Sequence, residues 1–268
     1  MQIIGEKINS TLNSVGKAIA ERDAESIEKL AIQQTEAGAD WLDLNVGTNP
    51  RDEAEDLVWL IRTTEKVTDL PFCLDSPNPE ILEIAINTVS KTPMINSITL
   101  EPFRLEDILP LVAKHDCKVI ALALDSKGRG SEDVGDRLRN VRQLIEETRR
   151  AGVSDDDVYV DAILTPIGIN TKNGQIGIQT IDSIHTEFPN VHVSAGLSNV
   201  SFGLPGRSLL NRAFLTLALS AGLDCAIMDP LDRELMGAML ATQALLGRDP
   251  FCRSYTTSFK QGRIGPTP

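Results

Sequence analysis

The stretch AGADWLDLNVG, residues 37–47, contains the unit that decides the fold. Gly38 stands where a helix would end in a left-handed residue, and a short apolar run follows at 41–46. Such a run is typical of a strand that is buried on both faces of a parallel sheet. Its polar residues, Asp43 and Asn45, alternate along the strand and therefore point to the same side. The stretch thus predicts a helix followed by a buried strand with a polar end.

The same unit recurs along the chain. Between the apolar runs, apolar residues fall at helical spacing, as at Leu138, Val141 and Ile145, and Gly152 and Gly222 mark further helix ends. The predicted strands lie at residues 2–5, 41–46, 71–75, 94–96, 118–124, 158–163, 191–197 and 225–228.

Strict alternation of strand and helix implies a parallel sheet with right-handed crossovers. Eight units in about 250 residues are typical of a closed barrel. An open doubly wound sheet is the competing fold, but the first strand–helix turn, residues 5–13, has no G-x-G-x-x-G fingerprint. We therefore predict an α/β fold, a single (β/α)8 TIM barrel over residues 1–262, with a flexible tail at 263–268.

Composition narrows the class of protein. The 268 residues are 41% hydrophobic and 24% charged, which fits one compact barrel. No signal-like N-terminus or membrane-length apolar run occurs, so we expect a cytoplasmic protein without a membrane partner. The net charge of −12 argues against nucleic acid as a partner. Four scattered cysteines form no CxxC pair and encode neither a zinc knuckle nor an iron–sulfur cluster.

Polar residues gather at the predicted strand ends, where a barrel places its chemistry. His115, His185 and His192 are not among them, which argues against zinc or iron, and Lys7 is the one lysine that a Schiff base could use. We therefore expect no metal. The ring consists of Glu6, Asn9, Asp43, Asn45, Asp75, Ser76, Asn96, Ser97, Asp125, Asp161, Ser198, Asn199 and Asp229.

Carboxylates and amides at fixed positions suit the edge of a neutral heterocycle that has adjacent N–H donors and ring acceptors. An aminopyrimidinone is such a ligand, because its amino group and ring N–H can donate to one carboxylate. Two other interpretations stay open. Asp, Asn and Ser are also the preferred N-cap residues of helices, and a carboxylate ring also suits a hard cation such as magnesium.

Six segments at these strand ends resemble the pterin-binding methyltransferase family. That family includes methyltetrahydrofolate:corrinoid protein methyltransferases and the folate module of cobalamin-dependent methionine synthase. The resemblance runs from Ile4 to about Phe259. One position differs from the corrinoid/iron–sulfur branch, which carries a glutamine where this chain has Phe202. The segments are LDLNVG, FCLDS, MINS, VYVDAI, GLSNVSFGLPGRSLLNRAFL and GLDCAIMDPLDREL.

The resemblance implies a role for each matching residue. Asn199 would hydrogen-bond nitrogen 5 of the folate, the atom that bears the methyl group, and we add Asp43 as a catalytic residue that relays a proton through water. The bond to Asn199 would strengthen in the transition state. The substrate-binding residues would be Asp75, Asn96, Asp161, Gly196, Ser198, Asn199 and Arg207.

The expected activity is transfer of a methyl group between 5-methyltetrahydrofolate and the cobalt of a corrinoid protein, in either direction. One such direction serves the demethylation of methylated amines such as glycine betaine. The folate is a substrate, and the cobalamin is carried by a partner protein in trans. The alternatives are a dihydropteroate synthase-like enzyme and a folate-binding protein without catalysis. The resemblance also implies a homodimer, for which the apolar helix at 209–219 offers a surface.

Overall fold

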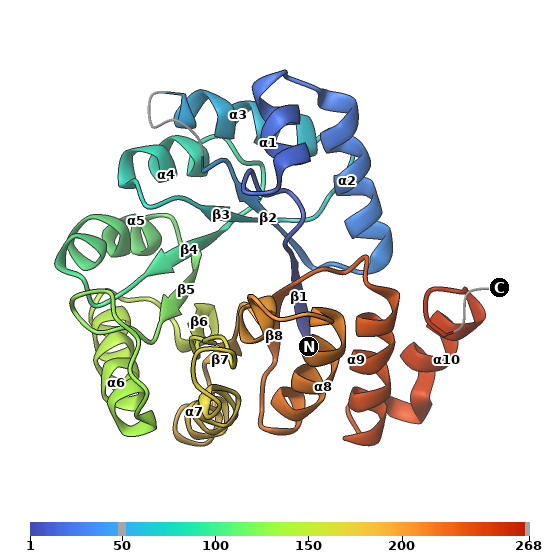
Figure 1. Cartoon of the computed structure of the whole chain (residues 1–268). Coiled ribbons are helices and arrows are strands. Elements are labelled where there is room, and N and C mark those ends of the chain that lie inside the picture. The colour runs from blue at the N-terminus through green and yellow to red at the C-terminus, as the bar shows by residue number, and fades with distance from the viewer. Residues whose placement is uncertain (48–51, 266–268) are drawn as a thin grey trace.

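Eight parallel strands form one closed sheet, and helices surround it (Figure 1). The structure is a computed structural model that describes residues 1–47 and 52–265. The strands pair in the order β7-β6-β5-β4-β3-β2-β1-β8. Backbone hydrogen bonds join the two outer strands, from Asp224 N to Val193 O at 3.1 Å and from Ile227 N to Ala195 O at 3.0 Å. The predicted (β/α)8 barrel is therefore confirmed.

The strands are β1 (Gln2–Gly5), β2 (Trp41–Asn45), β3 (Phe72–Asp75), β4 (Met94–Ile98), β5 (Lys118–Leu122), β6 (Val158–Asp161), β7 (His192–Ser194) and β8 (Cys225–Met228). Several of them end earlier than the apolar runs suggest. After β6, the Asp161 carboxylate accepts a hydrogen bond from Ile163 N at 2.7 Å, and Ile163 adopts a left-handed φ of 57°. The side chain thus turns the chain out of the sheet although the sequence remains apolar.

The helices are α1 (Asn13–Ala20), α2 (Ala24–Ala37), α3 (Glu53–Thr64), α4 (Pro79–Ile86), α5 (Leu109–Lys114), α6 (Val134–Arg150), α7 (Asn173–Glu187), α8 (Arg207–Ser220), α9 (Arg233–Leu245) and α10 (Arg253–Lys260). A π-helical turn (Arg104–Ile108) precedes α5, and 3-10 turns lie at Asp155–Asp157, Leu197–Ser201 and Pro250–Cys252. Gly38, Gly152 and Gly222 all have positive φ, as expected of helix ends. No helix among the described residues is long and apolar enough to span a bilayer.

The C-terminal segment packs outside the ring of helices. Figure 1 shows α10 beside α9, away from the barrel axis. Within the tail predicted at 263–268, Ile264 is 4% exposed and belongs to the main hydrophobic core, and Arg263 N donates to Ser258 O at 2.9 Å. Residues 266–268 lie outside the described residues.

Two hydrophobic clusters hold the barrel together. The larger one lies between the sheet and the helices, as expected for strands that are buried on both faces. A smaller cluster has the buried thiols of Cys73 and Cys225 at its core, so these cysteines are packing residues. The other members of the smaller cluster are Ile4, Trp41, Met94, Ile120 and Tyr159.

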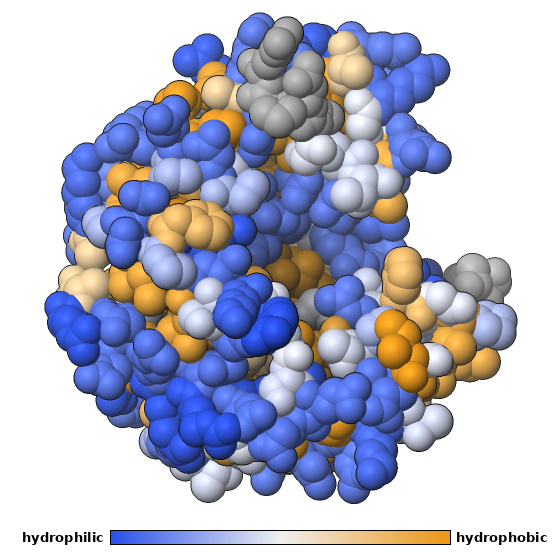
Figure 2. Space-filling view, turned by 60° about the vertical axis from the view of Figure 1, so that its left-hand side comes forward, coloured by the Kyte–Doolittle hydropathy of each residue, from blue (hydrophilic) through white to orange (hydrophobic). Residues whose placement is uncertain are grey.

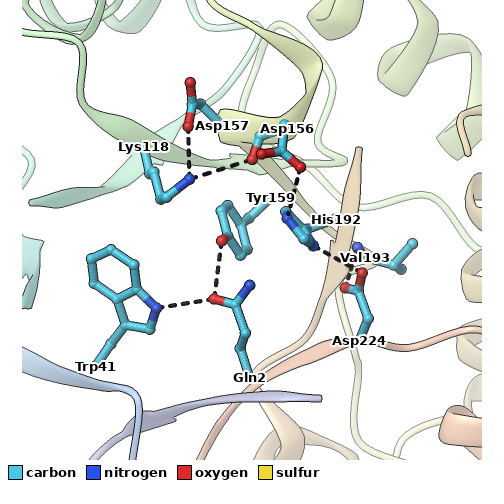
Figure 3. Close-up of polar contacts among 9 residues, drawn as sticks. All are labelled: Gln2, Trp41, Lys118, Asp156, Asp157, Tyr159, His192, Val193 and Asp224. Carbon is cyan, nitrogen blue, oxygen red and sulfur yellow. Dashed lines mark hydrogen bonds and ion pairs between the residues drawn. The ribbon is translucent and has the colours of Figure 1, made fainter. Parts of the chain in front are cut away.

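Polar side chains close the amino-terminal end of the barrel, and all of those in Figure 3 have partners. Gln2 Oε1 accepts hydrogen bonds from Trp41 Nε1 and Tyr159 Oη, each at 3.0 Å. The Tyr159 ring stacks on His192 with 4.4 Å between ring centroids, and His192 Nδ1 lies 2.9 Å from Asp224 Oδ2. We call these five residues the base cluster. His192 is thus used for packing at the end opposite to the predicted site.

Candidate active site at the barrel mouth

A cavity of about 760 Å³ opens at the carboxyl ends of the strands. In the space-filling view a hollow leads inward between hydrophilic side chains, with hydrophobic residues in its depth (Figure 2). Asp161 does not line the cavity itself but lies directly behind it, because its carboxylate binds the backbone of Gly196 in the wall. The predicted site residues that line the cavity are Asp43, Asp75, Asn96, Gly196, Ser198, Asn199 and Arg207.

Asp43, which is buried, and Asp75, which is half-buried, form an acidic pair on neighbouring strands. Asp43 is 3% exposed, and its pKa is raised well above the usual range by burial and by the charge of Asp75. The pKa of Asp75 is also raised by burial, although Asn45 Nδ2 donates to Asp75 Oδ2 at 2.6 Å. Among the described residues, Asp43 Oδ1 and Asn45 Oδ1 have no hydrogen-bond partner. Unsatisfied buried acceptors cost free energy unless a ligand's donors meet them.

The Asp161 carboxylate is held by backbone N–H groups rather than by a basic side chain. It accepts from Ile163 N at 2.7 Å and from Gly196 N at 3.2 Å. Burial raises the pKa of Asp161 to about 6, against these hydrogen bonds and the positive charge of Arg137. Arg137 itself is buried and donates to the carbonyl oxygens of Ala162 and Ile163 at 2.7 Å. The segment after β6 is therefore fixed from both sides.

Asn199 lies in the 3-10 turn that follows β7. A Cβ atom on Gly196 would lie 3.0 Å from Asn199 Nδ2, so glycine makes room for the amide at this position. Arg207 stabilises the same turn, because its Nη2 donates to Ser198 O at 2.7 Å and its Nε donates to Ser201 Oγ at 3.1 Å. The predicted pocket residue Arg207 thus both lines the cavity and orients the segment that presents Asn199.

Glu6 is a site residue that the sequence placed in the polar ring but to which it gave no role. It lines the cavity. Burial and the nearby charge of Asp229 raise its pKa to about 7, while Lys7 and Arg207 lower it. Lys7 Nζ lies 3.1 Å from Asp229 Oδ2, so the one candidate lysine is paired. The only sequence signal for Glu6 was its position directly after β1, because its environment depends on residues from the far end of the chain.

The N-cap interpretation is wrong for most of the ring. The helices α4, α6 and α9 have as N-caps Asn78, Asp133 and Asp232, and these side chains accept the capping hydrogen bonds. Asp43, Asp75, Asn96 and Asp161 cap none of the described helices.

Other members of the polar ring form hydrogen bonds or ion pairs that stabilise their own loops. The Asp125 carboxylate accepts hydrogen bonds from the backbone N–H and then the side chain of Arg129, which lower its pKa to about 2. Ser76 Oγ donates to Glu53 Oε1 at 2.6 Å.

The described residues contain no group of three or more His, Cys, Asp or Glu side chains that could hold a metal ion. The cavity presents carboxylate acceptors such as Asp43 and Asp75 next to amide side chains such as Asn96 and Asn199. Such a surface can hold a planar heterocycle through its hydrogen-bonding edge.

A closed barrel with carboxylates and amides at its mouth fits the class of pterin-binding barrels. The chain belongs to the family described as pterin binding enzyme, whose model matches residues 5–229. Within that family, the chain is 37% identical to the methylcorrinoid:tetrahydrofolate methyltransferase of Eubacterium limosum over 268 residues, which are 99% of this chain and 98% of the relative. It is 31% identical to the methionine synthases of Mycobacterium leprae and Mycobacterium tuberculosis over 84% of this chain, but it spans only 20% of those proteins.

Solved structures give the same fold. Dihydropteroate synthase from Stenotrophomonas maltophilia matches with a TM-score of 0.68 and 18% identity, over 92% of this chain and 91% of that one. Dihydropteroate synthase from Coxiella burnetii matches with a TM-score of 0.66 and 21% identity, over 96% and 94%. At such low identity these likenesses describe the fold and not the reaction.

Proposed function

We propose that the protein transfers a methyl group between a corrinoid protein and nitrogen 5 of tetrahydrofolate. The observation that carries the proposal is the acidic pair Asp43–Asp75 at the barrel mouth, in which Asp43 is buried with an unsatisfied acceptor oxygen. The full-length relative whose name states this reaction supports it. That name also gives a direction, from the methylcorrinoid to tetrahydrofolate, which we propose for this chain as well.

The pterin ring would be held by Asp75, Asn96 and Asp161. A pterin edge offers an amino group and a ring N–H to carboxylate acceptors, and the raised pKa values of Asp75 and Asp161 reflect burial that such donors would offset. Asn96 and Asn45 can serve both donors and acceptors. The residues present fit the ligand, since Asp75 and Asn96 line the cavity and Asp161 lies directly behind its wall.

Asn199 would act at nitrogen 5. When bound, the corrinoid supplies a cobalt that carries the methyl group, and this chain's residues control the proton on nitrogen 5. Asn199 Nδ2 can donate a hydrogen bond to this nitrogen or, with its oxygen, accept one from the protonated form. Asp43 and Glu6 both line the cavity, and burial raises the pKa of each, that of Glu6 to about 7, so both are candidates to hold or release this proton.

The remaining parts of the proposal concern partners and place. The corrinoid is carried by a separate protein that docks over the mouth, and the enzyme acts in the cytoplasm. We also propose a homodimer, for which Leu209 and Leu217 on α8 offer an apolar surface, being 67% and 54% exposed.

A dihydropteroate synthase-like reaction has less support from the site. Its pyrophosphate leaving group would need free cations at the last two strands. Here Lys7 is paired with Asp229, and the guanidinium of Arg207 is engaged by Ser198 and Ser201. A binding protein without catalysis would have no use for Asn199 beside nitrogen 5.

Single-turnover mixing tests the proposal. The protein is mixed with methylcob(III)alamin and tetrahydrofolate, and methyltetrahydrofolate is measured by mass spectrometry. We expect methyltetrahydrofolate in proportion to enzyme. In a separate reaction with dihydropterin pyrophosphate and p-aminobenzoate, we expect no dihydropteroate. Tight folate binding without any methyl transfer would favour the binding-protein alternative.

A further inference from the structure

A second cavity, of about 790 Å³, lies on the side of the barrel between α9, α10 and the end of α2. It is about as large as the cavity at the mouth, and Figure 1 shows α9 and α10 side by side. Its floor is apolar, because the buried side chains of Met236, Met239 and Ile264 line it. We call it the arginine groove after four arginines in its lining, which are Arg233, Arg248, Arg253 and Arg263.

The four arginines of the groove have no acidic partner. Arg248 Nη1 donates to Leu219 O at 3.0 Å and Arg263 Nη2 donates to Gln261 Oε1, so these partners are neutral. In the part of the chain that the structure describes, none of the four forms an ion pair. Arginines on α6 and α8, by contrast, pair with carboxylates.

The acidic residues of the groove do not offset this charge. Asp249 accepts hydrogen bonds from two backbone N–H groups in the first turn of α10, each at 3.0 Å. Asp40 accepts one from Ile3 N at 2.8 Å, and Glu36 is the third carboxylate in the lining. Four guanidinium groups therefore face three carboxylates, two of which are engaged by the backbone. In a chain with a net charge of −12, such a local surplus of positive charge favours an anionic ligand.

The arginines lie at the two ends of the groove. Arg233 begins α9, and Arg263 lies at the same end, because its neighbour Ile264 packs on Gly237, where a Cβ atom would lie 3.7 Å from Ile264 Cβ. The other two arginines lie where α9 connects to α10. The 13 residues of α9 span about 20 Å. An elongated anion can therefore meet guanidinium groups at both ends and lay its methylene groups on the apolar floor between them.

The start of α9 separates the groove from the mouth cavity. Asp229 and Asp232 line the mouth cavity, whereas Leu231 and Arg233 line the groove. The two cavities thus share one short wall. A chain that leaves the mouth over this wall meets Arg233 first.

We propose that the arginine groove binds the oligo-γ-glutamate tail of a folate whose pterin ring lies in the mouth, an inference that rests on the proposed function. A folate ends in glutamate, and each further γ-linked glutamate adds one free carboxylate. These carboxylates are separated by methylene groups and an amide, which matches guanidinium groups spaced along an apolar floor. Ser254 and Thr257 also line the groove, and their hydroxyl groups can donate to the amides.

The chain offers a matched control. Arg62 on α3 is exposed and forms no ion pair with any described residue. It lines neither the groove nor the mouth cavity. Arg62→Ala therefore removes an unpaired surface arginine from a different place.

The test compares tetrahydrofolates that carry one and four γ-linked glutamates, with affinities measured by isothermal titration. In the parent and in Arg62→Ala, we expect the tetraglutamate to bind about tenfold more tightly than the monoglutamate. In the double variant Arg233→Ala/Arg263→Ala, this gain should fall to about threefold or less, while the affinity for the monoglutamate stays unchanged. Added salt should reduce the gain in the parent, because exposed ion pairs are screened. Thermal melts check that the variants are folded.

Equal affinities of the parent for the two folates would overturn the inference, and so would a gain that the double variant keeps in full. Failure of the proposed function looks different, because the parent then binds neither folate. Free γ-linked tetraglutamate tests the groove in that case. Binding to the parent and to Arg62→Ala but not to the double variant would support an oligoglutamate site, and absence of binding to the parent would overturn it.

Discussion

The two ends of the barrel differ in whether their buried polar groups have hydrogen-bond partners. In the base cluster, the single oxygen of Gln2 serves both Trp41 and Tyr159, and His192 is paired with Asp224. At the mouth, burial raises the pKa values of Glu6, Asp43, Asp75 and Asp161, and Asp43 Oδ1 has no partner among the described residues.

This difference indicates that the amino-terminal end of the barrel stabilises the fold and that the mouth carries the chemistry. Satisfied polar groups add stability, whereas under-satisfied carboxylates cost stability and are kept where a ligand needs them. Substitutions at the base should therefore lower stability and leave chemistry intact, and substitutions at the mouth should do the reverse.

The largest effect is expected at Asn199. If its hydrogen bond strengthens only as nitrogen 5 changes protonation, Asn199→Ala should lower the single-turnover rate of methyl transfer about 100-fold. Folate affinity should stay within severalfold of the parent, because ground-state binding rests on other residues. Asn190→Ala is the control, because Asn190 is exposed in the turn before β7 at the opposite end of the barrel. A variant that melts earlier but transfers at the parental rate would make Asn199 a structural residue only.

The next effect is the loss of a pterin-binding carboxylate. Asp161→Ala should weaken tetrahydrofolate binding by about 1.5–3 kcal/mol, because the donors of the ligand are left unsatisfied. Isothermal titration measures it. Asp125→Ala provides a matched control, since Asp125 also follows a strand but its carboxylate is used by Arg129. Equal affinities in the two variants would remove Asp161 from the site.

Tyr159→Phe probes the base cluster. It removes the hydrogen bond to Gln2 Oε1 and keeps the ring stacked on His192, so the free energy of unfolding should fall by about 1 kcal/mol. Thermal melts should show a loss of roughly 2–4 °C. Tetrahydrofolate affinity should not change, and a weaker affinity would contradict the division between the two ends.

The smallest effect is the pH dependence that Glu6 contributes. Because its pKa is raised from 4.5 to about 7, the folded state binds its proton more tightly than the unfolded state does. Glu6 therefore lowers stability progressively as the pH rises through this window, and Glu6→Gln removes that loss. Urea unfolding should show Glu6→Gln more stable than the parent at about pH 8, and no more stable at about pH 4. If the difference in unfolding free energy between Glu6→Gln and the parent were the same at both pH values, the pKa of Glu6 would not be raised in the folded protein.

The sequence predicted the barrel because buried parallel strands and amphipathic helices leave strong periodic signals. It also predicted the polar ring, because the end of a buried strand is visible in the sequence as the point where an apolar run stops and polar residues begin. It did not predict which ring members are reactive. Asp125 and Asp161 look alike in sequence, but one meets Arg129 four residues later and the other meets Gly196 from another strand. The raised pKa of Glu6 likewise depends on Asp229. Such contacts form only when the barrel closes.

The most direct test of this division combines the two ends in one measurement. Thermal melts of Asp75→Ala and Tyr159→Phe are recorded with and without saturating tetrahydrofolate, because a ligand that binds the folded state raises the melting temperature. We predict that Tyr159→Phe melts below the parent but keeps the full folate-induced rise, and that Asp75→Ala loses most of that rise. An Asp75→Ala protein that tetrahydrofolate stabilises as much as it stabilises the parent would contradict the assignment of the mouth as the folate site.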